Sequence, residues 1–435
     1  PRSTLSSSSA ASDVYKRQIK SSGSIGANLT RDNRWVPKYD MGIKSQGSAE
    51  LIDGRNITYN WKWENTLNFT KSINQHHINV LIGQTREYWS STNLVATGRE
   101  YVYPELRLIG NATNTSAMEY FSEWALSSYL GRVIYDYRSK YLLAASIRRD
   151  GSSIFGPNKR FGNFPSASVG WKFLDEGFIR EIVPDVVKTG KIRIGWGQSG
   201  SQNFRPYLWE GEIRLHPYAN YTFNGIDFIP GAYPVNAGNK NLGWETIEQI
   251  NFGLDLTFFE NKLAFTTDYY SKRTRDMLLI LPQPSIIGNL TDPPSNLGEV
   301  SNSGFEFDLS YRKMEGEINY TLKANLTTIQ NKVNYIGTEG IQGRDFRNQN
   351  ELAPTMTQEG YPIAYFFGWK TDGIFQNQEE IESLIVRDDQ GNIVRHYQSP
   401  LTQPGDIKFV DVDGNGYIDD DDRTYIGKSV PDLVY

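Results

Sequence analysis

The stretch DVDGNGYIDDDD, residues 411–422, spaces its oxygen-bearing side chains like a calcium-binding loop. Carboxylate or amide side chains stand at loop positions 1, 3, 5, 9 and 12, and a glycine stands at position 6. Calcium prefers about six to eight hard oxygen ligands at roughly 2.3–2.6 Å. The predicted ligands are Asp411, Asp413, Asn415, the backbone carbonyl of Tyr417, Asp419 and Asp422.

Two interpretations of this stretch stay open. Calcium is favoured because so many neighbouring aspartates repel one another unless a cation neutralises them. An acidic turn rich in Asp, Asn and Gly, without an ion, is the alternative. Asp422 stands where a bidentate glutamate is usual, so we expect weaker affinity. We predict a strand in DIKFV before the loop and a loop in RTYIGKSVPD after it, so an ion here would stiffen the chain rather than catalyse a reaction.

The composition of the 435-residue chain favours a membrane β-barrel. Aromatic residues reach 13%, yet hydrophobic residues make up only 38% and the mean hydropathy is −0.53. A barrel reconciles these values because its strands expose apolar side chains to lipid while the lumen and loops stay polar. The sequence has no apolar run long enough for a transmembrane helix. Zero cysteines exclude disulfides and thiolate sites, and the net charge of −5 gives no basic footprint for nucleic acid.

Alternation of apolar and polar residues is the clearest pattern that the elements show. In QINFGLDLTFF the residues Ile250, Phe252 and Leu254 share one face, and Asn251 and Asp255 share the other. Such alternation predicts strands with one apolar and one polar face. We predict neighbouring antiparallel strands at 250–258, 262–270, 304–312 and 317–327, and earlier ones at about 57–70, 77–88, 127–137, 141–149, 166–173 and 190–197.

The connections are predicted to alternate in length, as in outer-membrane barrels. Short turns are expected at 138–140, 259–262 and 312–317, and long polar excursions near 89–125, 150–165, 198–246 and 271–303. Strands of about 9 to 11 residues are what a tilted crossing of the bilayer needs. One or two helical turns are expected within 174–186. A soluble β-sandwich is the alternative, but it explains neither this alternation nor the Tyr and Trp at the strand ends.

Several segments resemble the barrel of SusC/RagA-type TonB-dependent outer-membrane transporters. They include KIRIGWGQSGSQN (191–203), NLGEVSNSGFEFDLSYR (296–312) and PGDIKFVDVDGNGYIDDDDRTYIG (404–427). The resemblance implies an all-β, antiparallel transmembrane β-barrel, here an incomplete fragment of a 22-stranded barrel without its plug domain and final strands. We expect residues 1–18 to be an unstructured sequencing artefact and residues 19–435 to be this partial barrel domain.

The resemblance also implies a function. Such a protein imports a bulky nutrient, an oligosaccharide or a peptide, across the outer membrane of a Gram-negative bacterium. Its expected partners are a SusD-like surface lipoprotein, the TonB system, outer-membrane lipid and the substrate, with no nucleic acid. Calcium at residues 411–422 is the one expected cofactor, and no enzyme activity is expected.

Other functions leave weaker signs in the sequence. A surface adhesin or a carbohydrate-binding β-protein without transport is the main alternative. A carbohydrate-active enzyme would need two carboxylates held at a set separation, which spacing cannot show. The segment 198–246 carries aromatic residues that could stack on sugars, but packing against neighbouring loops explains them equally simply. The substrate-binding residues are therefore unknown from the sequence.

Overall fold

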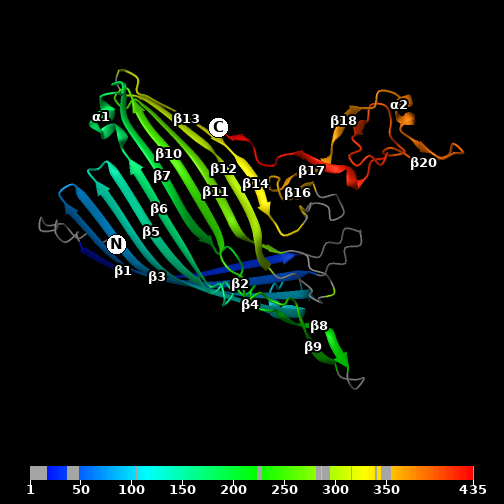
Figure 1. Cartoon of the computed structure of the whole chain (residues 1–435). Helices are drawn as coiled ribbons and strands as arrows, with labels where there is room; N and C mark the ends of the chain where they lie inside the picture. Colours follow the sequence, from blue (N-terminus) through cyan, green and yellow to red (C-terminus); the bar gives the residue numbers. More distant parts are fainter. Residues whose placement is uncertain are drawn as a thin grey trace. The chain divides into compact units, whose positions relative to one another are not determined.

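The computed structural model describes residues 17–36, 49–103, 105–222, 228–280, 286, 294–314, 316–338, 340–343 and 354–434 (Figure 1). The chain divides into two compact units, and each is described by itself. The first comprises residues 1–180, 191–247 and 278–296, and the second comprises residues 181–190, 248–277 and 297–435.

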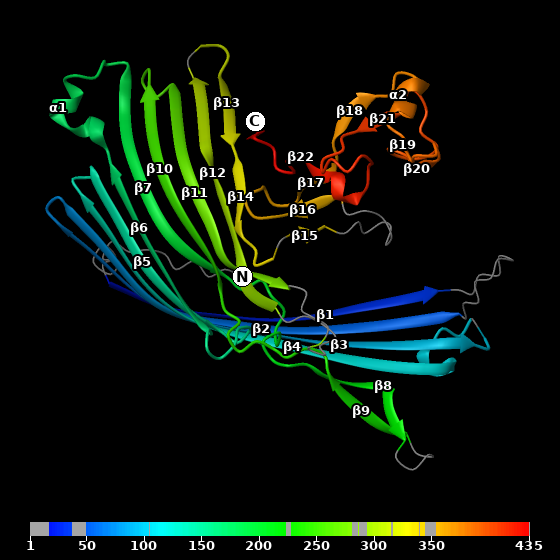
Figure 2. The ribbon, with the colours of Figure 1, turned by 45° about the vertical axis from the view of Figure 1, so that its right-hand side comes forward.

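The first unit is built on a meander of long strands (Figure 2). Each strand from β1 to β7 pairs antiparallel with the next one along the chain. The strands are β1 (Arg17–Val36), β2 (Glu50–Ile73), β3 (His76–Tyr101), β4 (Ala112–Tyr137), β5 (Tyr141–Ser152), β6 (Phe161–Trp171) and β7 (Val187–Ser201). A separate hairpin joins β8 (Ile213–Thr222) to β9 (Phe228–Pro234). The remaining elements are η2 (Ile109–Asn111), η3 (Phe173–Asp175) and α1 (Gly177–Arg180).

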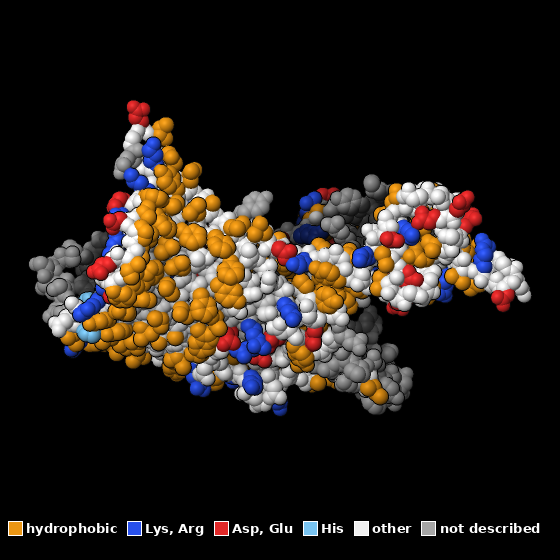
Figure 3. All heavy atoms as spheres, turned by 45° about the horizontal axis from the view of Figure 1, so that its top comes forward, with side chains coloured by type: hydrophobic (Ala, Val, Ile, Leu, Met, Phe, Trp, Pro, Cys, Tyr) orange, Lys and Arg blue, Asp and Glu red, His pale blue; other side chains and the backbone are white. Residues whose placement is uncertain are grey.

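The register of this sheet sorts side chains onto two different faces. One row across five strands consists of Ile78, Tyr135, Leu143, Val169 and Ile194. The neighbouring row, on the opposite face, consists of Asn79, Ile134, Ala144, Ser168 and Gly195. Because successive residues of a strand point to opposite faces, the first face is a band of large apolar side chains and the second carries smaller and polar ones. Figure 3 shows hydrophobic side chains gathered over a broad area of one face of the molecule.

Short turns join the strands at one end of the meander, as predicted. Arg138 and Ser139 have φ values of 57° and 53°, and Asn74 has 53°. Such left-handed residues match the twist of two-residue hairpins. Backbone hydrogen bonds also link one turn to the next: the Arg138 amide donates to the Gln75 carbonyl at 2.9 Å, and the Lys172 amide donates to the Lys140 carbonyl at 2.9 Å.

Aromatic rings collect beside these turns. The His76 ring stacks on Tyr137 with centroids 4.7 Å apart, and Tyr137 stacks on Tyr141 at 6.1 Å. Trp171 lies opposite Tyr141 in the β5–β6 register. Amphipathic rings of this kind favour the membrane–water interface. The arrangement confirms the predicted gathering of aromatic residues at the strand ends.

Strand lengths and several loops differ from the sequence prediction. β3 and β4 have 26 residues each, where about 9 to 11 were expected. They stay paired as far as Tyr101 opposite Ala112, so the predicted loop at 89–125 is wrong over most of its length. The segment 271–303 is likewise shortened because β11 and β12 extend into it. Beyond the apolar band, pairing between strands satisfies the backbone N–H and C=O groups, and this pairing does not require apolar and polar side chains to alternate. The helical turns expected within 174–186 are present as η3 and α1.

A small apolar core packs on the polar face of the first unit. Ile154, Phe155, Phe164 and Trp244 are buried together, with Trp124 and Phe204 against them. The Gly156 amide donates to the Leu242 carbonyl at 2.9 Å, which draws the two connections together. A Cβ on Gly156 would lie 2.2 Å from the Lys240 carbonyl oxygen, so only glycine fits there.

The second unit contains the four neighbouring strands predicted from alternation. They are β10 (Glu245–Phe258), β11 (Leu263–Ile280), β12 (Pro294–Lys313) and β13 (Tyr320–Thr328). The rings of Phe252, Tyr269 and Phe305 follow one another at 6.4 and 5.1 Å, which confirms that these positions share a face. On β10 and β11, the Thr266 hydroxyl donates to the Asp255 carboxylate at 3.2 Å. The turn after Phe258 is where it was predicted, whereas the next strand begins only at Tyr320, so the turn predicted at 312–317 runs later.

Shorter elements of the second unit surround the acidic stretch. A four-stranded sheet has the order β15-β16-β17-β22, β18 pairs with β21, and β19 pairs with β20. The bounds are β14 (Gln330–Tyr335), β15 (Ile341–Gln342), β16 (Thr355–Thr357), β17 (Tyr365–Trp369), β18 (Thr371–Ile374), α2 (Gln378–Ser383), β19 (Val386–Arg387), β20 (Ile393–Arg395), β21 (Ile407–Phe409), η5 (Asp420–Asp422), β22 (Arg423–Gly427) and β23 (Leu433–Val434).

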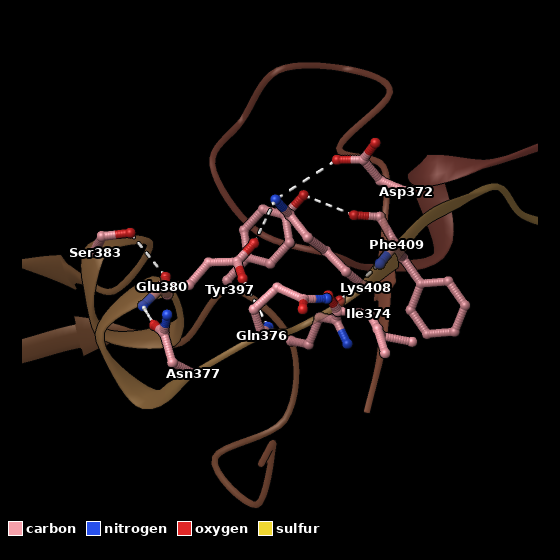
Figure 4. Close-up of polar contacts among 10 residues, drawn as sticks. Asp372, Ile374, Gln376, Asn377, Glu380, Ser383, Tyr397, Lys408 and Phe409 are labelled. Atoms are coloured by element: carbon pink, nitrogen blue, oxygen red, sulfur yellow. Dashed lines mark hydrogen bonds and ion pairs between the residues drawn. The ribbon is translucent and has the colours of Figure 1, made fainter. Parts of the chain in front are cut away.

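Lys408 of β21 joins α2 to β18 through two carboxylates (Figure 4). Its ammonium lies 3.1 Å from Glu380 and 3.5 Å from Asp372. The Asn377 side chain caps α2 by accepting the Glu380 amide at 2.9 Å. A hydrogen bond from the Gln376 amide, and then one from Lys408, lower the pKa of Glu380 below its ordinary value. This network fixes a six-residue helix that is too short to be stable alone.

Candidate functional site

The acidic stretch 411–422 connects β21 to β22. The strand predicted before it is present at Ile407–Phe409. The residues after it were predicted as a loop, and this is wrong for Arg423–Gly427, which form β22 and pair with β17. The stretch is therefore held by a strand at each end, so its ends have fixed positions within this part of the second unit.

Three of the six predicted ligands come together. Carboxylate oxygens of Asp411, Asp413 and Asp422 all lie within 4.8 Å of one another. Asp422 is fully buried, and its two oxygens accept the amides of Val412 at 2.7 Å and Asp419 at 2.8 Å. Buried carboxylates need such partners because isolated buried charge is costly. The spacing of the sequence thus placed these three acidic groups correctly.

The other three predicted ligands have local partners. Asn415 accepts the Tyr417 amide with its side-chain oxygen at 3.0 Å and donates to Asp413 at 3.0 Å. Asp419 accepts the Asp421 amide at 2.8 Å and so caps the η5 turn; among the described residues it is not part of the three-carboxylate group. Whether Asn415, the Tyr417 carbonyl and Asp419 reach a common ion remains the prediction made from spacing.

Backbone amides converge on Asp411. Its carboxylate accepts the amides of Gly414 and Gly416, each at 2.7 Å, and that of Asn415 at 3.2 Å. Gly416 has a φ of 90°, a conformation that glycine adopts easily. Partial burial acts to raise the pKa of Asp411, but the amides of Gly416 and Gly414 outweigh it, and the net pKa is lowered.

The neighbouring carboxyl group shows the cost of gathering negative charge. The Asn415 amide acts to lower the pKa of Asp413, but desolvation by neighbouring groups and the closeness of Asp411 and Asp422 outweigh it, so the pKa of Asp413 is raised. Like charges at this separation disfavour joint ionisation. The donor set is hard oxygen throughout, which fits calcium better than a softer metal.

Aromatic side chains frame the stretch. The Trp369 indole donates to the Asp419 carbonyl at 2.6 Å, and the Arg395 guanidinium lies 3.6 Å from the centre of the Tyr417 ring. The Ile418 amide donates to the Tyr397 carbonyl at 2.6 Å. These contacts attach the stretch to β17 and β20 and do not involve the grouped carboxylates of Asp411, Asp413 and Asp422.

The aromatic residues noted in 198–246 have mixed outcomes. Trp209 packs, as the simpler interpretation expected, with its indole donating to the Ser153 carbonyl at 3.2 Å. Tyr207 lines a pocket in the first unit. The structure does not describe four further aromatic side chains of this segment, those of Tyr218, Tyr221, Phe223 and Phe228. A different pocket of the first unit is lined by Trp89 and Trp124, which belong to strands that sequence reasoning had treated as a loop.

Comparison with known proteins identifies the family. A family described as "TonB dependent receptor-like, beta-barrel" matches residues 3–426. The chain belongs to this family. The match, together with the antiparallel meander and its two faces, confirms the predicted outer-membrane β-barrel. Among the described residues, no helix is both long and apolar enough to cross a membrane.

Curated relatives of this TonB-dependent receptor chain are longer than it is. TonB-dependent receptor P39 of Formosa agariphila is 30% identical over 420 residues, which are 88% of this chain and 38% of the relative. TonB-dependent receptor SusC of Bacteroides thetaiotaomicron is 26% identical over 382 residues, covering 86% and 35% of the two chains. The chain therefore spans less than half the length of these relatives.

Solved structures share the fold. The structure of the RagAB peptide transporter superposes with a TM-score of 0.76 at 21% identity, over 96% of this chain and 43% of that one. The structure of the same importer in its "open-open" state gives a TM-score of 0.75. Residues 1–18 were expected to be an unstructured artefact. The structure does not describe residues 1–16, whereas Arg17 and Gln18 are the first residues of β1 and are therefore structured.

Proposed function

We propose that this chain is part of a receptor that imports a bulky nutrient, an oligosaccharide or a peptide, across the outer membrane. The observation that carries the proposal is the match to the TonB-dependent receptor barrel along residues 3–426. A sheet with one apolar and one polar face suits a wall between lipid and an aqueous passage. Energy would come through the TonB system, and a SusD-like surface lipoprotein would hold the substrate outside.

Transport of this kind makes and breaks no covalent bond, so we propose that the protein is not an enzyme. Its side chains would then act only by binding the substrate and by shaping the passage. Uptake against a concentration gradient needs work, because a passage with equal affinity at every stage only equalises the substrate concentration on its two sides. This need for work is the physical reason to couple the barrel to an energy source.

Uptake in the bacterium that produces the full-length receptor tests the proposal. Labelled oligosaccharides and labelled peptides of similar size are offered to cells lacking the receptor gene, cells lacking TonB and unmodified cells. We expect the two deletions to abolish uptake of the same compound. Uptake that persists without TonB would contradict the proposal, even if the receptor were needed for it.

We also propose that the stretch 411–422 binds calcium. Three carboxylates within 4.8 Å, one of them fully buried, support this proposal. The ion would offset the repulsion that raises the pKa of Asp413 and would stiffen the connection between β21 and β22. Calorimetric titration of the full-length receptor with calcium tests it. Replacing Asp411 and Asp413 together with alanine should remove one binding event, and an unchanged titration would show that the site does not exist.

A further inference from the structure

A pocket of about 750 Å³ lies in the first unit, at the polar face of the sheet. Pockets for small molecules commonly fall in this size range. Its lining combines two indole rings with hydroxyl, amide and guanidinium groups, namely those of Trp89, Trp124, Ser122, Ser201, Gln202 and Arg205. Among the described lining residues none is acidic, and Arg205 is the charged one.

Strand register creates the aromatic part of this pocket. Trp89 of β3 lies directly opposite Trp124 of β4, and the two rings are nearly parallel, with centroids 6.5 Å apart and planes at 18°. Counting by twos along β3 places Trp89 with Asn79, on the face opposite the apolar band of Ile78. Both rings are only partly buried. They therefore form an apolar platform of two indole rings on the polar face of the sheet.

Gln202 supplies an unused hydrogen-bond acceptor. Its side-chain oxygen is buried, and within the described part of the chain it has no hydrogen-bond partner. Buried polar atoms nearly always have one, so an unpartnered oxygen on a residue that lines the pocket indicates a missing donor. A hydroxyl or amide hydrogen from a ligand would satisfy this oxygen.

The segment that carries Gln202 is already fixed in place. The Phe204 amide donates to the Gln202 carbonyl at 2.7 Å, and the Asn239 amide donates to the Trp209 carbonyl at 2.9 Å. Tyr207 holds a left-handed conformation, with φ of 67°, which non-glycine residues adopt rarely. Such strain persists only where surrounding contacts enforce it. The pocket is thus preformed, which reduces the entropy lost on binding.

A second pocket of about 450 Å³ adjoins the first and shares Ser122, Arg205 and Pro206 with it. Phe121 and Tyr207 add aromatic rings there, and Glu210 and Glu212 add carboxylates. Two adjoining pockets with shared residues suit a ligand made of repeated units. These carboxylates could also attract the positively charged amino group of a peptide, so a peptide is the competing ligand to test.

We propose that the Trp89–Trp124 pocket binds a sugar ring of an oligosaccharide. This inference rests on the proposed import function and narrows its substrate from a glycan or peptide to a glycan. A pyranose presents C–H groups on its faces and hydroxyls around its edge. The faces match the indole platform, while the hydroxyls match the Gln202 oxygen, the serine hydroxyls and the Arg205 guanidinium. An aromatic surface beside mostly neutral hydrogen-bonding groups recognises this combination better than an extended peptide backbone.

Binding by the purified full-length receptor in detergent tests the inference. The probes are hexaoses of glucose, mannose, galactose and xylose, with hexapeptides as the comparison, and the readout is tryptophan fluorescence confirmed by calorimetry. Trp89→Leu removes half of the platform and should weaken hexaose binding about tenfold or more. Gln202→Leu should weaken it about five- to tenfold by removing one hydrogen bond. Because the Gln202 side-chain oxygen has no partner within the described chain, the second variant costs the free protein no hydrogen bond at that atom.

Trp61→Leu is the matched control. Trp61 is 41% exposed and stacks on Tyr88 at 6.2 Å, on the face of the sheet away from Trp89. It should leave hexaose affinity unchanged. The inference is overturned if no hexaose binds, if Trp89→Leu and Gln202→Leu bind a hexaose as tightly as Trp61→Leu does, or if the two pocket variants weaken hexapeptides alone.

Cellular uptake separates failure of this inference from failure of the import function. If TonB-dependent uptake persists unchanged in cells carrying Trp89→Leu or Gln202→Leu, the receptor imports its nutrient without this pocket, and only the present inference fails. If the purified receptor binds a hexaose through Trp89 and Gln202 but cells do not import it in a TonB-dependent manner, the pocket stands and the import function fails.

Discussion

A charge placed at Ile147 probes the assignment of the two faces of the sheet. Ile147 lies on β5 in the apolar band, 55% exposed, opposite Gly131 and Pro165. From Tyr141 at the aromatic end, the strand runs about 20 Å to Ile147 at roughly 3.3 Å per residue. A tilt of about 45° turns this into a depth of about 14 Å. The apolar band of such barrels is about 25 Å tall, so Ile147 should lie near its middle.

Arginine at Ile147 should therefore reduce the free energy of unfolding by about 2–4 kcal/mol, the cost of a cation near the bilayer midplane. The same reasoning places Leu143 only about 5 Å from the aromatic end, where an arginine should cost roughly 0–1 kcal/mol. Ser146 lies on the opposite face, where its hydroxyl is 2.7 Å from that of Ser166. Ser146→Asn is the control for that face and should change the free energy of unfolding by less than about 1 kcal/mol.

Urea titration of the full-length receptor refolded into lipid vesicles measures these differences. The depth order, with Ile147→Arg more costly than Leu143→Arg, is the informative result because both variants add the same charge to the same strand. Equal costs at the two positions would refute the placement of the band. A cost for Ser146→Asn as large as that for Ile147→Arg would refute the assignment of the faces.

Three further predictions concern single residues. Gly156→Ala should lower the free energy of unfolding by about 1–3 kcal/mol, since the added Cβ would lie 2.2 Å from the Lys240 carbonyl oxygen. A melting curve that matches that of the unmodified receptor would contradict this. Asp422→Asn should cost about 1–3 kcal/mol because an amide nitrogen cannot accept a backbone N–H, and faster amide exchange across 411–427 is the measurement. The lowered pKa of Glu380 reflects stabilisation of α2 that is complete above the ordinary pKa and is lost as the pH falls through the lowered one, so amide hydrogen exchange in α2, corrected for intrinsic rates, should rise in acid. In Lys408→Met this pH dependence of exchange should shrink, because the ion pair with Glu380 is removed. An unchanged pH profile in this variant would exclude the ion pair as a cause of the lowered pKa.

Alternation predicted the strands in which apolar residues recur at every second position, and it failed where they do not. Phe252 and Phe305 share a face as expected, because burial in lipid selects large apolar residues at every second position. The outer parts of β3 and β4 carry no such selection, so their pairing is visible only in the structure. Trp89 and Trp124 became neighbours through the register of that pairing, which depends on the whole hairpin rather than on local sequence.

The acidic stretch shows the same division. Spacing placed Asp411, Asp413 and Asp422 in one group because a tight turn at Gly416 folds the chain back on itself. Asp419 was counted with them, yet its carboxylate accepts the Asp421 amide within the turn. Side chains of aspartate often bond to nearby backbone, and spacing cannot tell that role from metal ligation.

The links between successive short turns have a consequence for how the sheet assembles. The Arg138 amide donates to Gln75 and the Lys172 amide to Lys140, so the end of one hairpin is tied to the turn that precedes it in the chain. These contacts join residues 63 and 32 positions apart in the chain, so each of them closes a long loop, and closing a longer loop costs more entropy. We expect the hairpins that the short turns close to form first, and the links between successive turns to form after the intervening strands have paired. An insertion that lengthens the turn at Arg138 should therefore slow folding more than it lowers final stability.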